Sequence, residues 1–183
     1  ARARFDEPLE LAGQGLALAV RGGDGTTQAA AHLQLGRCFI NLGRHAEAEE
    51  SLEQATALAE LVGAGEVGAQ SERMLGVALL FLGRLDESRP HLHRGLAGWD
   101  ALGRPGRAAW CAINLGQVAK QAGDLDTVEQ WLDEARARFL LAGSRVGLAE
   151  CDNGLGEVYR QRGELAKASA SYTQALHWYR AAG

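Results

Sequence analysis

The sequence lacks a long hydrophobic run and an excess of positive charge. Its 183 residues carry a formal net charge of −4, whereas a nucleic-acid-binding surface is expected to be basic. No apolar stretch approaches the roughly 18 residues that can span a membrane, and no signal-peptide pattern is present. We therefore expect neither a nucleic acid nor a membrane among the partners.

Cysteine and metal-ligand patterns are scarce as well. The three cysteines are an odd number, which suits a reducing, cytoplasmic location. His91 and His93 are two residues apart and would point to different sides of a helix. The segment 22–25 lacks the Lys-Ser/Thr pair of a phosphate-binding loop. With no nucleophile–base constellation either, we expect no metal, no cofactor and no enzymatic activity.

What the sequence does have is a repeat of 40 residues without insertion or deletion. Its instances are Leu35-Gly36-x-x-Phe39, Leu75-Gly76-x-x-Leu79, Leu115-Gly116 and Leu155-Gly156-x-x-Tyr159, followed by Ala48-x-x-x-Leu52, Ser88-x-x-x-Leu92, Val128-x-x-x-Leu132 and Ala168-x-x-x-Tyr172. A fixed period of this size indicates stacked supersecondary units. The expected array is single and spans 1–183, with the second helix of a preceding repeat over 1–23 and repeats over 24–63, 64–103, 104–143 and 144–183. Because the chain starts within a repeat and without Met, we expect a fragment of a larger protein.

Each repeat is predicted to form two helices. The first helices are expected over 26–42, 66–82, 106–122 and 146–162, and the second over 5–22, 45–62, 85–102, 125–142 and 165–182. The turn glycines after the helices fit positions of positive φ; they are Gly23, Gly43, Gly63, Gly83, Gly103, Gly123, Gly143, Gly163 and Gly183. Asp24 or Thr26, Asp124 and Ser144 are candidate N-caps, and Pro105 suits a first helical turn.

Four further glycines lie inside the first helices, at Gly36, Gly76, Gly116 and Gly156. Because glycine is costly inside a helix, we expect the partner helix to cross too closely there for a Cβ. The second helices supply apolar stripes that we expect in the core; they comprise His45, Leu52, Ala55 and Ala59, then Leu85, Leu92, Gly95 and Trp99, then Leu125, Leu132, Ala135 and Phe139, then Leu165, Tyr172, Ala175 and Tyr179. Cys111 and Cys151 are expected to be buried thiols.

This pattern resembles the tetratricopeptide repeat over the whole chain, best in the fourth repeat. The family's usual repeat has 34 residues, and the 40-residue variety is similar to that of kinesin light chains and of sensor arrays in bacterial regulatory ATPases and kinases. HEAT and armadillo repeats also suit this length but lack the Leu-Gly pattern. The departures are a missing terminal Pro and, at the family's Trp position, His32, Glu72, Ala112 and Asp152. The resemblance implies an all-α fold, a right-handed α-solenoid of antiparallel pairs with about nine helices.

In the resembled family, the first helices line a concave groove that holds peptides or partner helices. By position, the groove rows here are Leu33, Gln34, Arg37, Ile40 and Asn41; Arg73, Met74, Val77, Leu80 and Phe81; Trp110, Ile113, Asn114, Gln117, Lys120 and Gln121; and Asn153, Glu157, Arg160 and Gln161. Asn114 matches the Asn that kinesin-light-chain repeats place on peptide backbones. The family's carboxylate clamp is not reproduced, because its positions hold Leu33, Arg73, Ile113 and Asn153.

Two functions follow as hypotheses. The first is a scaffold that binds a peptide or protein segment, as part of a bacterial signalling or regulatory protein. The second is self-association or intramolecular packing through the repeat ends, for example through Tyr172, Trp178 and Tyr179 in the last predicted helix, because unsealed ends leave apolar stripe exposed.

Overall fold

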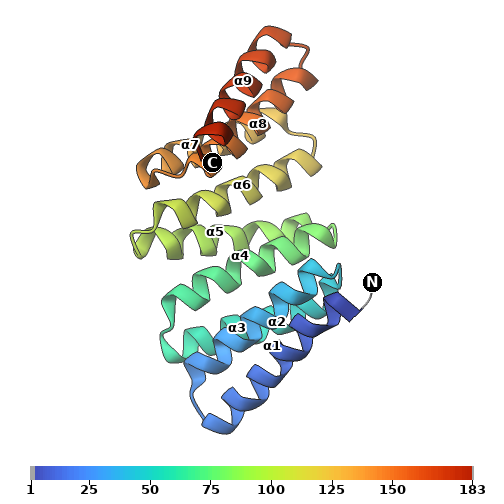
Figure 1. The fold of residues 1–183 in the computed structure, drawn as a ribbon, viewed down its shortest axis with the longest axis vertical. Helices are drawn as coiled ribbons and strands as arrows, with labels where there is room; N and C mark the ends of the chain where they lie inside the picture. Colours follow the sequence, from blue (N-terminus) through green and yellow to red (C-terminus); the bar gives the residue numbers. More distant parts are fainter. Residues whose placement is uncertain (1–2, 183) are drawn as a thin grey trace. The chain divides into compact units, whose positions relative to one another are not determined.

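The computed structural model describes residues 3–182, which form nine helices and no strand (Figure 1). The helices are α1 (Ala3–Gly22), α2 (Gly25–Asn41), α3 (His45–Val62), α4 (Gly65–Phe81), α5 (Leu85–Ala101), α6 (Pro105–Gln121), α7 (Leu125–Ala142), α8 (Arg145–Gln161) and α9 (Leu165–Ala182). Every predicted boundary lies within two residues of the observed one. The all-α prediction of paired helices is therefore confirmed.

The predicted caps and turns explain why the boundaries fall where they do. Asp24 accepts hydrogen bonds from the amides of Thr26 and Thr27, so Asp24 is the N-cap of α2. Asp124 and Ser144 cap α7 and α8 in the same way, and Pro105 begins α6. The turn glycines within the described residues all have positive φ, from 65° to 79°. Gly183 lies outside the described residues.

The chain forms two compact units, which divide within α5 between Gly98 and Trp99. In the first unit the core cluster joins α2, α3 and α4 and includes Leu33, Leu52 and Leu79. In the second unit a cluster of Val128, Leu132, Leu155 and Val158 joins α7 and α8, together with Ala119 of α6. Each of the two clusters therefore buries the stripe of one second helix, α3 or α7, between the first helices on either side.

The glycines inside the first helices are sites of close approach at three of the four positions. A Cβ at Gly36 would lie 2.5 Å from Leu52, one at Gly76 2.6 Å from Leu92, and one at Gly156 2.6 Å from Tyr172. At Gly116 the nearest atom would be Trp131 Cβ at 3.5 Å, an ordinary contact. The prediction is confirmed at the first three positions and wrong at Gly116.

The last helix differs from the preceding second helices in its burial. Phe139 of α7 is fully buried, but its equivalent in α9, Tyr179, is 40% exposed, and Leu165 is exposed as well. The prediction that Tyr179 lies in the core is therefore wrong. The reason is that α8 covers α7, whereas within residues 3–182 no helix follows α9.

The remaining expectations concern thiols and membrane spans. Cys111 and Cys151 are buried as predicted, and neither they nor Cys38 form a disulfide. Burial raises the pKa of the Cys151 thiol to about 12, so this thiol stays protonated at neutral pH. Across the described residues, every helix is too short or too polar to cross a membrane.

Candidate functional site

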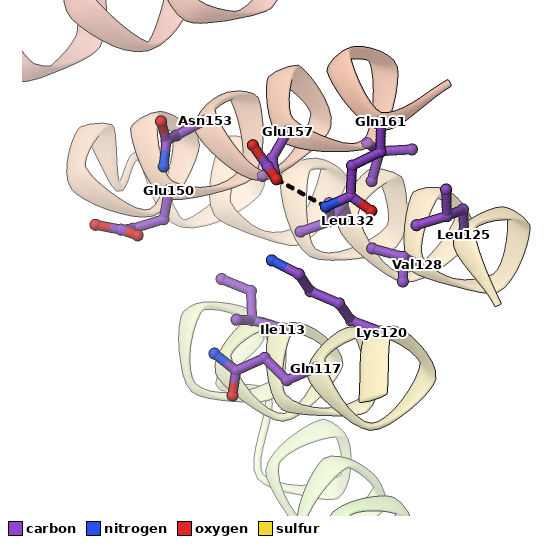
Figure 2. Close-up of a pocket in the computed structure, with 13 residues that line it drawn as sticks. Ile113, Gln117, Lys120, Leu125, Val128, Leu132, Glu150, Asn153, Glu157 and Gln161 are labelled. Carbon is purple, nitrogen blue, oxygen red and sulfur yellow. Dashed lines mark hydrogen bonds between the residues drawn. The ribbon is translucent and has the colours of Figure 1, made fainter. Parts of the chain in front are cut away.

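A hollow of about 160 Å³ opens between α6, α7 and α8 of the second unit (Figure 2). Residues from all three helices line it: Ile113, Gly116, Gln117 and Lys120 of α6; Leu125, Val128 and Leu132 of α7; and Glu150, Asn153, Gly154, Glu157, Val158 and Gln161 of α8. We call this hollow the groove. Its floor is apolar and its rims carry amides and charges.

The floor comes from α7, the second helix of the third repeat. Val128 and Leu132 are buried in the same core cluster as Val158 of α8, and Leu125 packs partly buried against that cluster. Because these side chains are held by the core, the floor is preformed. A rigid apolar floor suits an apolar side chain of a ligand.

One rim carries the amine of Lys120. Figure 2 shows this side chain extending from α6 into the space in front of α7 and α8. Lys120 is exposed and forms no ion pair or hydrogen bond with any group in the described part of the chain. An ammonium group held over an apolar floor can attract a carboxylate.

The opposite rim, on α8, is organised by hydrogen bonds to two glutamates. Arg160 donates to Glu157 at 2.7 and 2.9 Å. Gln161 donates to Glu157 at 2.7 Å (Figure 2). Glu150 accepts a hydrogen bond of 2.8 Å from the hydroxyl of Tyr179. The negative charge of Glu157 is thus neutralised by Arg160. Lys120 and Glu150 are the lining residues of the groove that carry a charge without an ion-pair partner in the described part of the chain.

The stabilisation that the Glu157–Arg160 ion pair contributes to the folded chain depends on pH. Hydrogen bonds from Arg160, and then from Gln161, lower the pKa of Glu157 from 4.5 to about 2. Because the folded-state pKa is depressed, the stabilisation by this pair is present above pH 4.5 and is lost as the pH falls toward 2. We expect the side-chain carboxyl carbon of Glu157 to titrate near pH 2 by NMR, and closer to the ordinary value of 4.5 in Arg160→Leu.

Arg162→Leu is the matched control for this prediction. Arg162 pairs with Asp126 and Glu129 rather than with Glu157. Its removal should leave the midpoint of Glu157 unchanged. A midpoint of Glu157 near 4.5 in the unaltered chain would show that the ion pair with Arg160 does not form.

The structure places the predicted groove residues of the first unit in several environments. Gln34, Arg37 and Asn41 of α2 are exposed, and Arg37 donates to Gln34 at 3.2 Å. In α4, Met74 belongs to the core cluster and Val77 is buried. Their side chains therefore contribute to the interior, which the position-by-position assignment did not anticipate.

Two further predicted residues of α4 contact other side chains of the first unit. Arg73 donates a 3.2 Å hydrogen bond to the sulfur of Met74. Phe81 is exposed and stacks on His45, with ring centroids 4.7 Å apart. The aromatic and basic groups of α4 are thus engaged by α3 and by α4 itself.

In the second unit, four of the predicted groove residues line the same hollow, namely Gln117, Lys120, Asn153 and Glu157. Asn114 is buried and donates to Gln117 at 3.3 Å. The side chains placed elsewhere are those of Trp110, Gln121 and Arg160. Trp110 lines a separate hollow with Pro105 and packs edge-on against Phe139, while Gln121 and Arg160 are exposed near the ends of α6 and α8.

Sequence reasoning missed the floor and one rim residue of the groove. Leu125 and Leu132 belong to a stripe that the helical spacing assigned wholly to the core, although both also line the groove. Val128 was named only as a position of the repeat pattern. Glu150 follows no repeated pattern, because its equivalents are Ala30, Gln70 and Trp110. The spacing of the α7 stripe was the one signal that could have located the floor.

The architecture and the repeat define a class, the helical-repeat arrays. Family models described as Tetratricopeptide repeat match residues 69–140 and 29–60, together more than half of the 183 residues. The chain belongs to the tetratricopeptide repeat family. No curated protein matches the chain.

Solved structures share this fold at low sequence identity. BtubC (BKLC) from P. vanneervenii has a TM-score of 0.84 and 21% identity to this chain. The match covers 98% of this chain and 75% of the BtubC chain. A putative kinesin light chain from Podospora anserina, with nearly identical TPR-like repeats, has a TM-score of 0.75 and 18% identity, with coverage of 97% and 87%. The Rap conjugation gene regulator of plasmid pLS20, in complex with the Phr* peptide, has a TM-score of 0.75 and 21% identity. The match to this regulator covers 86% of the present chain and 43% of the regulator.

Proposed function

We propose that the chain is a protein-interaction scaffold that holds an extended segment of a partner protein in the groove of its second unit. The observation that carries the proposal is the amine of Lys120, which has no charged partner in the described part of the chain and stands beside an apolar floor. A segment with a carboxylate next to an apolar side chain satisfies both features.

The amide side chains along the groove support the same proposal. Gln117 and Asn153 lie on opposite helices of the groove, α6 and α8 (Figure 2). Each side-chain amide has both a donor and an acceptor, so it can pair with the N–H and C=O of an extended backbone. The Rap regulator with a similar fold binds a peptide, the Phr* peptide, which is consistent with this use of the fold.

The setting that we propose is a cytoplasmic bacterial signalling or regulatory protein. The similarity in fold to a gene regulator and the resemblance to bacterial sensor arrays support this setting. The three cysteines without disulfides are compatible with a reducing compartment.

The test is a displayed library of random peptides, selected on the whole chain and then measured as synthetic peptides by fluorescence anisotropy. We expect selected peptides to carry an acidic residue or free carboxyl terminus beside an apolar residue. Lys120→Glu should weaken their binding at least about tenfold, because it replaces attraction by repulsion. Lys167→Glu is the control, since Lys167 pairs with Glu164 and does not line the groove.

Two results would contradict the proposal. One is a selection that enriches no peptide above the background of an unrelated protein. The other is a set of peptides that bind the Lys120 and Lys167 variants equally well, since the groove would then not be the binding site.

A further inference from the structure

One of the four glycines inside the first helices differs from the other three in what lies against it. At Gly36, Gly76 and Gly156, a leucine or tyrosine of the next helix comes within 2.6 Å of an added Cβ. At Gly116 the equivalent residue of the next helix is Leu132, and this side chain lies more than 4 Å from such a Cβ. Because Gly116 lines the groove, the space beside it opens toward the groove.

The reason is that Leu132 packs on a different glycine. A Cβ at Gly154 of α8 would lie 2.9 Å from a methyl group of Leu132. In the first unit, the residue equivalent to Gly154 is Met74, which belongs to the same core cluster as Leu52. With the Met74 side chain on that side, Leu52 lies on Gly36. The missing side chain at Gly154 allows Leu132 to turn toward α8 instead.

The space over Gly116 has the size and the lining of a pocket for one apolar side chain. The hollow measures about 160 Å³, and its walls include Val128, Leu132 and Gly154. An apolar cavity of about 150 Å³ admits a group as large as benzene, and the side chain of leucine is smaller than benzene. Leucine also fills two of the three equivalent sites in this chain, those over Gly36 and Gly76.

Lys120 stands next to this pocket. It follows Gly116 by four residues on α6, so the two share one face of the helix. Figure 2 shows the Lys120 side chain crossing the mouth of the groove in front of α7 and α8. A leucine with a carboxylate beside it therefore matches both the apolar pocket and the amine.

We propose that the groove selects one leucine side chain of the partner segment and holds it over Gly116. The partner then supplies the contact that Leu52 and Leu92 supply within the first unit's repeats. The inference rests on the proposed function of the groove and names the residue that the groove selects. Gly154 determines the specificity, because Leu132 leaves the pocket open only by leaning on it.

The test is an NMR titration of the isotope-labelled whole chain with N-acetyl-leucine, and with N-acetyl-alanine as the matched ligand control. We expect N-acetyl-leucine to shift the Gly116 amide and the Leu132 methyl signals saturably, and N-acetyl-alanine to leave them unchanged. Gly116→Ala should weaken binding of N-acetyl-leucine at least about tenfold, because one methyl group in an apolar pocket changes affinity about 10- to 200-fold. This variant should not unfold at a lower urea concentration, since the nearest atom to its Cβ would be 3.5 Å away.

A second variant closes the pocket from the opposite side. Gly154→Met recreates the arrangement around Met74, so it should return Leu132 to Gly116 and abolish the shifts caused by N-acetyl-leucine. Gly68→Ala is the control. It also adds a Cβ to a first helix in ordinary contact, 3.6 Å from Ala59, but outside the groove, and it should bind N-acetyl-leucine like the unaltered chain.

Three results would overturn the leucine pocket: no saturable shift with N-acetyl-leucine, equal shifts with N-acetyl-alanine, or binding that Gly116→Ala leaves intact. Selected peptides that bind the chain and are weakened by Lys120→Glu would then still support the groove as the binding site. Conversely, N-acetyl-leucine binding that Gly116→Ala abolishes, in a chain that enriches no peptide, would support the pocket and contradict the scaffold function. The two proposals can therefore fail separately.

Discussion

Replacing Phe139 with alanine should lower the free energy of unfolding by about 3–5 kcal/mol. Phe139 is fully buried, packs edge-on against Trp110 with ring centroids 5.1 Å apart, and fills the space in front of Gly147. Its loss removes the contacts that join α6, α7 and α8. Urea denaturation followed by circular dichroism measures the change, and amide hydrogen exchange assigns it to the second unit.

The substitution Gly147→Ala makes this prediction specific to the contact. In the unaltered chain its Cβ would lie 2.3 Å from the Phe139 ring, so we expect a loss of about 1–3 kcal/mol from overpacking. In the Phe139→Ala background the same change should be neutral or stabilising, because alanine favours a helix over glycine. Equal effects in both backgrounds would show that the ring does not press on Gly147.

Replacing Asp152 with alanine should cost about 2–3 kcal/mol. Asp152 is 4% exposed and joins three helices. It accepts 2.9 Å hydrogen bonds from Arg136 of α7 and from the indole of Trp178 of α9, and hydrogen bonds to a charged group contribute about 1.5–3 kcal/mol. The cost stays below the sum of both bonds because Arg136 is partly solvated. Thermal and urea unfolding measure it.

Asp133→Ala is the matched control for Asp152→Ala. Asp133 lies on α7, one turn before Arg136, the partner of Asp152. Burial, together with the charges of Glu129 and Asp152, raises the pKa of Asp133, so its charge is disfavoured in the folded chain. Removing it should cause no loss of stability at neutral pH. A loss as large as that of Asp152→Ala would show that any acidic residue near α8 matters, and not the specific pair of hydrogen bonds.

The helices and their turns could be predicted from the sequence because local residues determine them. Glycine at the positive-φ turns, Asp24, Asp124 and Ser144 at the N-caps and Pro105 at a first turn act within a few residues. The period of 40 then aligned these signals and removed ambiguity about which glycine ends a helix. The glycine–leucine contacts at Gly36 and Gly76 could be predicted for the same reason, since each repeat places the same pair in register.

The groove could be predicted only in part, because burial depends on which neighbours cover a position. Met74 occupies a groove position by alignment, but the core cluster of the first unit encloses it. The hydrogen bonds between side chains could not be predicted from the repeat either. Glu72 and Asp152 share a repeat position, yet Glu72 accepts hydrogen bonds from His91 and Arg94 while Asp152 accepts them from Arg136 and Trp178. Such pairs depend on residues that differ between repeats.

The scarcity of lysine makes the groove chemically addressable. The chain has two lysines, Lys120 and Lys167. Lys120 stands unpaired within the described residues, whereas Lys167 pairs with Glu164 and lies over the ring of Tyr159, 5.2 Å from its centroid. An amine-selective acylating reagent thus has one side-chain target in the groove and one internal reference outside it. The ratio of the two modifications, followed by mass spectrometry, reports occupancy of the groove without any engineered label.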